Sequence, residues 1–504
     1  MELARHWGIE EDLRNCGWPQ DHPQDVVWGT SLGDPEVARI EWPAISQMTP
    51  PPTSPTFAQR CPQVWFNPIL LGFAKRQTTV DVRLNHRLVD FEQDADEVRA
   101  RLWVGANDAV VTVRCRYLVA ADGARSGIRR SLDVPTVKSA AWGTSAEVIF
   151  RCPMIKTFPL ARTLGRFTLI EPSGMSVSLL PFDGKDQFRL TVMVDGGQKT
   201  QSDMLDVIHR LTGTPDIDVE FITPVLQWAS RETLAETFRI GRVFLAGDAA
   251  HTMPTTGGMG MNTGIGDSLD LGWKLDAVLS GWGGEHLLDS YDPERREAVV
   301  RTSAFASGIY RDWVATKEKL RGYWELIGQG GAAAVEGRRE LGKAIVTTFR
   351  REYNAVPAAL GYRYENSPII VPDDSAPVPD PLTEYFPSAR PGHRAPHVWV
   401  APGVSTLDLF GPGFALLVIG ETAGQGEALL RAAEDARLPL TSHTFASGPV
   451  AESMRAAYEA AYVLVRPDGH VSWRSERVPS SPCHILDVAR GAAPSKVRST
   501  AAVH

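Results

Sequence analysis

The sequence predicts an α/β protein with α+β features and more than one domain, and three observations lead to this prediction. A short β-run at residues 241–247 is followed by a glycine-rich loop and then a helical pattern. Residues 135–232 are rich in strand patterns and carry the turn signal Asp183-Gly184. A proline-rich stretch begins at Val371, and a compact pattern restarts after it.

Composition limits the classes of partner. A chain of 504 residues with 43% hydrophobic content can bury more than one core. The net charge is -8 and no run of Lys and Arg stands out, which argues against nucleic acid or an anionic membrane as a partner. Small molecules and proteins remain.

Cysteine usage and the amino terminus indicate a cytoplasmic protein without structural metal. Five cysteines are scattered, odd in number and never spaced C-x-x-C, so neither a disulfide framework nor a zinc site is predicted. The opening MELARHWGIEEDL has no apolar signal region, and no stretch approaches the roughly 18 apolar residues of a membrane-spanning helix. We therefore expect no membrane partner.

The first part of the chain alternates helical and strand patterns. Residues 1–13 read as the start of an amphipathic helix, and an apolar helical run covers Pro68 to Lys75. Alternating segments then predict a β-meander that ends in a buried strand from Tyr117 to Ala121. No strand, turn and helix unit precedes the prolines at 50–52.

Later segments predict a helical region and a separate terminal domain. Residues 293–353 are helix-like, and their aromatic residues more often mean core than function. After the linker, FALLVIG predicts a buried strand, AESMRAAYEAA a helix, and Pro467-Asp468-Gly469 the turn of a hairpin.

The segment from Gly241 to Gly281 carries the most specific chemistry. Asp248 follows a buried strand, where a carboxylate can accept hydrogen bonds from a chain of hydroxyls. Beyond Pro254, the glycines let the backbone approach a flat ligand closely because no Cβ intervenes. The first amides of the following helix can stabilise an anionic ring edge.

This segment, G-D-A-A-H-x-x-P-x-x-G-G-x-G-x-N, resembles the second flavin-binding motif of the FAD-dependent aromatic monooxygenases of the p-hydroxybenzoate hydroxylase and phenol hydroxylase type. In that family the aspartate binds the flavin ribityl chain, and the proline, glycines and following amides hold the isoalloxazine ring. The resemblance assigns these roles to Asp248, Pro254, Gly257, Gly258, Gly260, Met261 and Asn262. The alternative is a strand-to-helix turn with a capping aspartate.

Two weaker matches extend the resemblance. YLVAADGARSGIRRSLDV is similar to the family's D-G-x-x-S-x-x-R element, which touches flavin and nicotinamide and implicates Asp122 and Arg129. From the residues alone, it is equally a tight turn with a solvated arginine. CPQVWFNPIL resembles the place of a flavin-contacting glutamine, which implicates Gln63, although an exposed loop glutamine fits nearly as well.

No catalytic acid or base is predicted. His251 lies inside the flavin-binding motif, and it more often packs or hydrogen-bonds locally than transfers protons. No zinc-ligand spacing and no G-x-S-x-G pattern occurs, so neither a metal nor an acyl nucleophile is indicated.

The sequence departs from the family at its start. Members begin with a strand, a G-x-G-x-x-G turn and a helix that bind the FAD pyrophosphate, and this unit is missing here. Either the start is assigned at an internal methionine or the protein is truly shortened. In the second case the sheet would lose its central strand and FAD its pyrophosphate site.

The resemblance implies a Rossmann-like FAD/NAD(P)-binding domain truncated at the N-terminus, an antiparallel-sheet substrate domain and a thioredoxin-like C-terminal domain. The expected boundaries are 1–134 for the partial FAD-binding domain, 135–235 for the substrate domain, 236–370 for the FAD-binding segment and helical region, 371–392 for the linker and 393–504 for the terminal domain. That terminal domain lacks C-x-x-C and is expected to be structural or interfacial.

The function implied is hydroxylation of a phenolic or polyketide-like aromatic small molecule by FAD, NAD(P)H and O2 through a flavin C4a-hydroperoxide. Substrate contacts are expected on strands 175–182 and 188–194 and on the loop 253–256. The alternatives are a flavoprotein that oxidises or reduces without inserting oxygen, and a non-catalytic remnant that cannot retain FAD. The substrate, the choice between NADH and NADPH, and a homodimeric assembly stay open.

Overall fold

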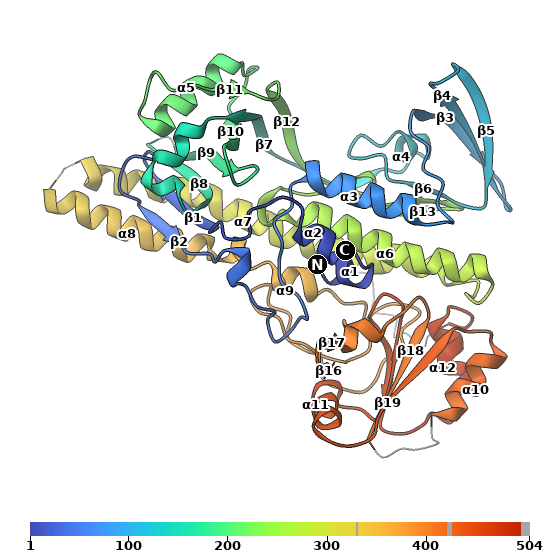
Figure 1. The fold of residues 1–504 in the computed structure, drawn as a ribbon. Helices are drawn as coiled ribbons and strands as arrows, with labels where there is room; N and C mark the ends of the chain where they lie inside the picture. The colour runs from blue at the N-terminus through green and yellow to red at the C-terminus, as the bar shows by residue number, and fades with distance from the viewer. Residues whose placement is uncertain (173, 329–330, 421–425, 495–504) are drawn as a thin grey trace.

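The computed structural model describes residues 1–172, 174–328, 331–420 and 426–494. A large mixed sheet lies at one end of two long helices, two small sheets lie toward the other end, and a compact C-terminal domain lies below (Figure 1). The predicted α/β fold class is confirmed.

The large sheet is mostly antiparallel, with strand order β15-β12-β7-β10-β9-β8-β1-β2 and β11 paired to β7. Its strands are β1 (Asp25–Gly29), β2 (Ala38–Ile40), β7 (Thr136–Arg151), β8 (Leu164–Glu171), β9 (Gly174–Pro181), β10 (Gln187–Val194), β11 (Glu220–Phe221), β12 (Leu226–Ala235) and β15 (His251–Thr252). The predicted turn at Asp183-Gly184 joins β9 to β10, and Gly184 has a φ of 71°. The sheet extends beyond the predicted segment 135–235, because β1 pairs in parallel with β8 and β15 pairs with β12.

Helices cover both faces of this sheet (Figure 1). On one face, alternate side chains such as Phe167, Leu179 and Leu190 form a core with α5 (Gln201–Thr212). On the other face, Trp28 and Ile170 pack against α7 (Tyr291–Gly328) and α8 (Gly331–Phe349). The helical region predicted over 293–353 is therefore a pair of long helices beneath the sheet.

A second, three-stranded sheet has the order β13-β14-β6, formed by β13 (Arg239–Ile240), β14 (Val243–Leu245) and β6 (Leu118–Ala120). The meander is a separate antiparallel sheet of β3 (His86–Gln93), β4 (Val98–Val104) and β5 (Ala109–Cys115). The expected buried last strand of the meander is corrected here. β6 instead runs parallel to β14, and Val119 is 41% exposed because β6 is an outer strand among the described residues.

The remaining helices follow the sequence pattern with local changes. They are α1 (Glu2–His6), α2 (Glu10–Arg14), α3 (Gln63–Arg76), α4 (Gly127–Ser131), α6 (Met259–Ser280) and α9 (Val356–Leu360). Short 3-10 turns are η1 (Ile45–Gln47), η2 (Pro153–Thr157), η3 (Pro159–Ala161), η4 (Gly247–Ala249), η5 (Thr256–Gly258), η6 (Leu288–Ser290), η7 (Arg350–Tyr353) and η8 (Thr406–Leu409). The helix expected over 1–13 is two short helices, because Gly8 has a φ of 70° and ends the first.

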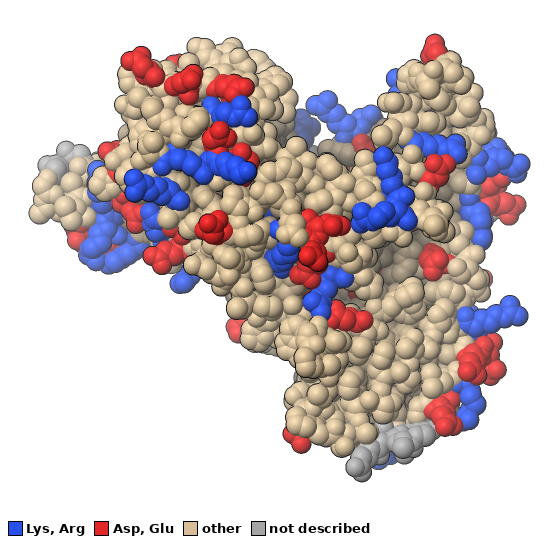
Figure 2. Space-filling model, in the orientation of Figure 1, with Lys and Arg blue, Asp and Glu red and all other residues tan. Residues whose placement is uncertain are grey.

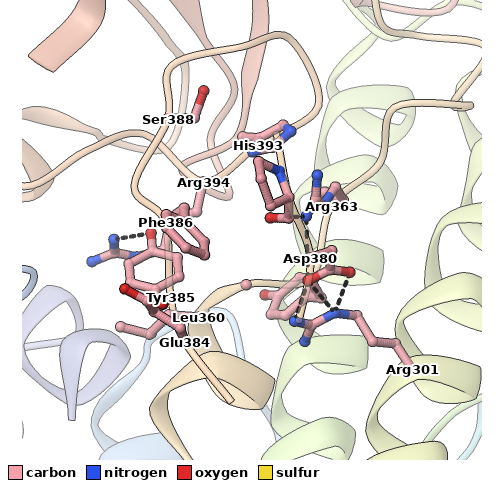
Figure 3. A pocket seen from close by; sticks show the side chains of 13 residues that line it. Arg301, Leu360, Arg363, Asp380, Glu384, Tyr385, Phe386, Ser388, His393 and Arg394 are labelled. Atoms are coloured by element: carbon pink, nitrogen blue, oxygen red, sulfur yellow. Dashed lines mark hydrogen bonds and ion pairs between the residues drawn. The ribbon is translucent and has the colours of Figure 1, made fainter. Parts of the chain in front are cut away.

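The linker is held to the helical region by arginines. Arg301 makes a bidentate pair with Asp380, with its Nε and one terminal nitrogen 2.9 and 2.6 Å from the two carboxylate oxygens. Arg363 donates to the carbonyl of Val378 at 2.9 Å. These side chains line a small cavity and are directed at one another across it (Figure 3). The cavity is therefore part of the attachment of the linker.

The C-terminal domain contains β16 (Trp399–Ala401), β17 (Val404–Ser405), β18 (Phe414–Ile419), α10 (Glu427–Asp435), β19 (Leu440–Phe445), α11 (Pro449–Tyr458), β20 (Tyr462–Val465), β21 (Val471–Ser475) and α12 (Pro482–Ala489). Its main sheet has the order β19-β18-β20-β21, with β18 and β19 parallel and the others antiparallel. The predicted hairpin at Pro467-Asp468-Gly469 joins β20 and β21.

A buried cluster of charges joins this domain to the rest of the protein. Arg466, beside the hairpin turn, contacts Glu294 of α7 at 2.6 Å and Asp270 of α6 at 3.1 Å. Lys274 completes the cluster, 2.7 Å from Asp270 and 2.5 Å from Glu294. Each of these four side chains is at most 1% exposed. The domain therefore docks directly on the two helices that also carry the candidate site.

The visible surface carries interspersed acidic and basic side chains rather than one extended field of either sign (Figure 2). Within the described ranges, no helix is both long and apolar enough to cross a membrane.

Candidate functional site

Two predicted motifs meet at the carboxyl ends of adjacent parallel strands. β6 and β14 are in register with Ala120 opposite Leu245, and the Ala246 amide donates to the Ala120 carbonyl at 3.0 Å. Because parallel strands end at the same edge of a sheet, the turns that contain Asp122 and Asp248 lie side by side. Ligands of open α/β sheets bind at such an edge.

Asp248 lies in the 3-10 turn η4, directly after β14. Gly247 makes this turn with a φ of 59°, which favours glycine. The Asp248 side chain is exposed and makes no hydrogen bond within the described residues, although nearby protein desolvates it enough to raise its pKa. Its carboxylate is thus an available acceptor at the sheet edge.

A buried carboxylate holds the Asp248 turn in place. Asp267 of α6 is fully buried and accepts a hydrogen bond from the Gly247 amide at 2.9 Å. The same carboxylate lies 2.7 Å from His251 Nε2 and 2.8 Å from Arg295 Nε of α7. Burial alone would raise the pKa of Asp267, but Arg295 and His251 outweigh it and lower this pKa to about 2. Asp267 is therefore an anion that fixes the turn.

Asp267 and Arg295 were not predicted from the sequence, although the position of Asp267 on the helix was one indication. Asp267 occurs in the same segment, 241–281, as Asp248 and falls on the buried face of α6. A charged residue on the buried face of a helix needs a partner, but the partner lies 28 residues away on another helix. For His251, the structure places the ring in the core, fully buried and hydrogen-bonded to Asp267 of α6.

The glycine-rich loop prepares a flat, open surface. Gly257 and Gly258 have φ values of 73° and 64°, and Pro254 before them is buried. A methyl group on Gly257 would lie 2.9 Å from Phe305 Cε1, so this glycine also permits close packing on α7. In contrast, apart from adjoining backbone, no atom of the described residues lies within 4 Å of a methyl group placed on Gly258 or Gly260. Backbone at these two positions faces open space.

Helix α6 begins at this surface, since Gly258 is its N-cap and no side chain in the described part of the protein caps its first amides. Met261 is 43% exposed, and the Asn262 side-chain amide donates to the Gly258 carbonyl at 2.8 Å. Uncapped amides at a helix start favour negative charge. The residues present therefore fit a flat ring with an anionic edge.

The motif around Asp122 mainly supports the turn. One Asp122 carboxylate oxygen accepts from the amides of Gly127 and Ile128 at 2.8 and 3.2 Å and so caps α4. Arg129 donates to the Ala249 carbonyl at 3.1 Å, next to Asp248. The Asp122 contacts agree with the alternative of a tight turn. Arg129, however, is half-buried and hydrogen-bonded rather than solvated, and its contact with Ala249 brings it to the site.

Gln63 is the first residue of α3 and is exposed. Its side chain makes no hydrogen bond within the described part of the chain. No contact in that part ties it to the Asp248 turn, so its role stays a prediction.

Comparison with known proteins assigns the family. A model of the FAD binding domain matches residues 1–306, and a model of the aromatic-ring hydroxylase C-terminal domain matches residues 388–490. Tetracenomycin B2 monooxygenase-dioxygenase from Streptomyces olivaceus is 32% identical over 97% of this chain and 88% of its own. 4-Methyl-5-nitrocatechol 5-monooxygenase from a Burkholderia species is 32% identical over 96% and 86%.

A solved structure supports the same family assignment. The rebeccamycin biosynthetic enzyme RebC with reduced flavin superimposes with a TM-score of 0.87 and 36% identity, covering 98% of this chain and 90% of that one. Fold and site thus define an FAD-dependent monooxygenase. The chain belongs to the FAD-dependent aromatic-ring hydroxylases, a family that includes enzymes of polyketide secondary metabolism.

Proposed function

We propose that this enzyme hydroxylates a phenolic or polyketide-like aromatic substrate, with NAD(P)H as reductant. When bound and reduced, FAD would supply the oxygen-activating chemistry through a C4a-hydroperoxide. The observation that carries the proposal is the open, glycine-lined start of α6 beside the carboxylate of Asp248, which has no partner among the described residues. The relatives support the substrate class, since one of them is named as a monooxygenase of a nitrocatechol.

Each residue of the site has a proposed task. Asp248 accepts hydrogen bonds from the ribityl hydroxyls, and Gly258 and Gly260 allow the ring to approach the backbone. The amides near Met261 and Asn262 stabilise the negative edge of the ring. Pro254 and Gly257 shape the loop, and Arg129 supports it through the Ala249 carbonyl. Asp122 and Gln63 are proposed as outer contacts of the cofactor.

The protein's main contribution is to orient the substrate and exclude water. Met253 of the loop and Met259, the first residue of α6, pack with Phe305 and Ile309 of α7 into an apolar cluster. This cluster forms one wall beside the loop, which limits the access of water to the ring from that side. We place the substrate on the sheet face that is directed toward this wall.

The direct test uses the purified, flavin-loaded protein. We expect the visible absorbance of oxidised flavin, NAD(P)H consumption that a polycyclic phenol stimulates, and incorporation of one atom of isotope-labelled O2 into the product. Stimulated consumption without incorporation would indicate an oxidase or reductase. A protein that cannot bind added FAD would contradict the proposal.

Replacing Gly260 with Ala is expected to separate folding from flavin binding. The residue lies in the first turn of α6 with open space beside it, so Ala should leave stability unchanged or raise it by up to about 1 kcal/mol. The added methyl group would occupy the approach of the ring and weaken flavin retention. Thermal unfolding and flavin release are measured on the same samples. Equal flavin retention in both proteins would contradict the assignment.

A further inference from the structure

A buried arginine connects the Asp248 turn to a part of the chain that lies outside the sequence motifs. Arg295 of α7 donates from Nε to Asp267 at 2.8 Å and from one terminal nitrogen to the Thr263 carbonyl at 3.1 Å. Its other terminal nitrogen donates to the hydroxyl of Tyr364 at 2.7 Å. Arg295 and Tyr364 are each 1% exposed. Within the described residues, the Tyr364 hydroxyl is thus one of three acceptors that hold this guanidinium away from water.

Two side chains, Arg295 and Asp267, connect Tyr364 to the turn η4. The Asp267 carboxylate accepts from Arg295 with one oxygen and from the Gly247 amide of the turn, at 2.9 Å, with the other. A methyl group on Gly266, the residue before Asp267, would lie 2.8 Å from a terminal nitrogen of Arg295. The guanidinium therefore lies in close contact with the backbone of α6, and its orientation determines where the Asp267 carboxylate can bind the turn.

The C-terminal domain holds the Tyr364 ring in place. The ring centroids of Tyr364 and His470 are 4.4 Å apart, and the Arg466 guanidinium lies 5.1 Å from the Tyr364 ring centroid. His470 and Arg466 lie in the connection between β20 and β21. The backbone amide of Tyr364 donates to the Gly392 carbonyl at 2.8 Å. These contacts leave the Tyr364 hydroxyl directed at Arg295, so the terminal domain contributes to the orientation of that arginine.

The Tyr364 hydroxyl is a neutral acceptor. Burial raises the pKa of Tyr364 well above its ordinary value, so the hydroxyl keeps its proton. Asp267 therefore supplies the negative charge that balances Arg295, and Tyr364 supplies a hydrogen bond that fixes the direction of the guanidinium. Without the hydroxyl, the ion pair would remain but one buried N–H group of Arg295 would lose its partner.

From these contacts we propose that Tyr364 is a positioning residue of the flavin site. Its hydroxyl aligns Arg295 with Asp267, and Asp267 then holds the turn that presents Asp248 to the cofactor. The inference rests on the proposed function, in which Asp248 binds the ribityl chain. It extends the site to a residue that is nearly 100 positions away from the flavin-binding motif and is held by the C-terminal domain.

Tyr364→Phe tests the proposal because it removes the hydroxyl and keeps the ring. In the apoprotein, hydrogen exchange followed by mass spectrometry should become faster in residues 243–250, since local opening of the turn becomes easier. FAD retention should fall about three- to tenfold, less than in Asp248→Ala, because the effect passes through two side chains. The visible circular dichroism of the bound flavin should also change, since the ribityl contact is displaced.

The matched control is Tyr458→Phe. Tyr458 of α11 is also fully buried, and its hydroxyl donates to the Pro396 carbonyl at 2.7 Å within the C-terminal domain. This variant should lower the thermal midpoint, as Tyr364→Phe does, but leave exchange in residues 243–250 and FAD retention unchanged. Equal changes in the two variants, or no change in Tyr364→Phe, would overturn the positioning role.

The double variant of Asp248→Ala and Tyr364→Phe tests the route of the effect. If Tyr364 acts through the turn that presents Asp248, the second substitution should weaken FAD retention by no more than about twofold beyond Asp248→Ala alone. A loss equal to the product of the two single losses would overturn the proposed route. Faster exchange in a Tyr364→Phe protein whose parent binds no FAD would contradict the proposed function and support the positioning role. Normal FAD retention with unchanged exchange in Tyr364→Phe would remove the positioning role alone.

Discussion

Asp267→Asn is expected to lower the free energy of unfolding by about 3–5 kcal/mol, the cost of removing one partner from a buried ion pair. Arg295 would remain buried without its carboxylate. The backbone amide of Gly247 and the imidazole of His251 would lose their charged hydrogen-bond partner. Chemical denaturation of the two proteins measures the difference. The same variant should also release flavin more readily, because Asp267 fixes the turn that presents Asp248.

The stabilisation that Asp267 provides should decrease as the pH falls. Its pKa is about 2 in the folded protein, below the value of about 3.9 for an unfolded aspartate. The stabilisation is therefore fully present above about pH 4 and is lost as the pH falls toward 2, so the two proteins should converge in acid.

Asp276→Asn is the matched control for Asp267→Asn, since Asp276 lies on the same helix and is exposed. It should change stability by no more than about 0.5 kcal/mol. Equal stability of Asp267→Asn and Asp276→Asn at neutral pH would show that Asp267 does not hold the turn.

Asp248→Ala is expected to weaken FAD retention about 10- to 100-fold with almost no change in stability. The loss corresponds to about 1.5–3 kcal/mol for hydrogen bonds to a charged acceptor. Stability should be kept because the exposed carboxylate makes no hydrogen bond within the described residues. Flavin release during dialysis and thermal unfolding of the apoprotein measure the two quantities separately.

Asp248→Asn tests whether the charge of the carboxylate contributes to FAD retention. An amide keeps an acceptor oxygen but loses the charge, so its flavin retention should lie between those of the Ala variant and the unchanged protein. Unchanged cofactor content in Asp248→Ala would contradict the assignment of the ribityl contact. A loss of stability as large as in Asp267→Asn would show that the side chain acts in the fold rather than on the cofactor.

Local sequence patterns predicted the parts of the site that are continuous in the chain. A strand, a turn with Asp248, glycines and a helix follow one another within 241–281, and each depends on neighbours a few residues away. The start of α6 was predicted for the same reason, as was the hairpin at Pro467-Asp468-Gly469. The family, the α/β fold class and the cofactor FAD followed from these patterns and are confirmed.

Other predictions from the same patterns remain untested. The domain boundaries, the roles of the cofactor-contacting residues, and the use of NAD(P)H and O2 are of this kind. The Asp122 motif shows why a local pattern can predict either a ligand contact or a structural turn. The same carboxylate that could face a ligand caps α4 here.

What the sequence alone determined is therefore the strand, glycine-rich loop and helix of residues 241–281 and, through the resemblance that they carry, the family. Only the tertiary structure decided that β1 and β2 join the substrate sheet, that Asp267 pairs with Arg295, and that Arg129 reaches the Ala249 carbonyl beside Asp248. The physical reason is the sequence separation over which each interaction acts. Dihedral preference and hydrophobic periodicity act over a few residues, whereas a charged side chain in the folded protein can pair with a residue at any sequence separation. Burial then strengthens the pairing.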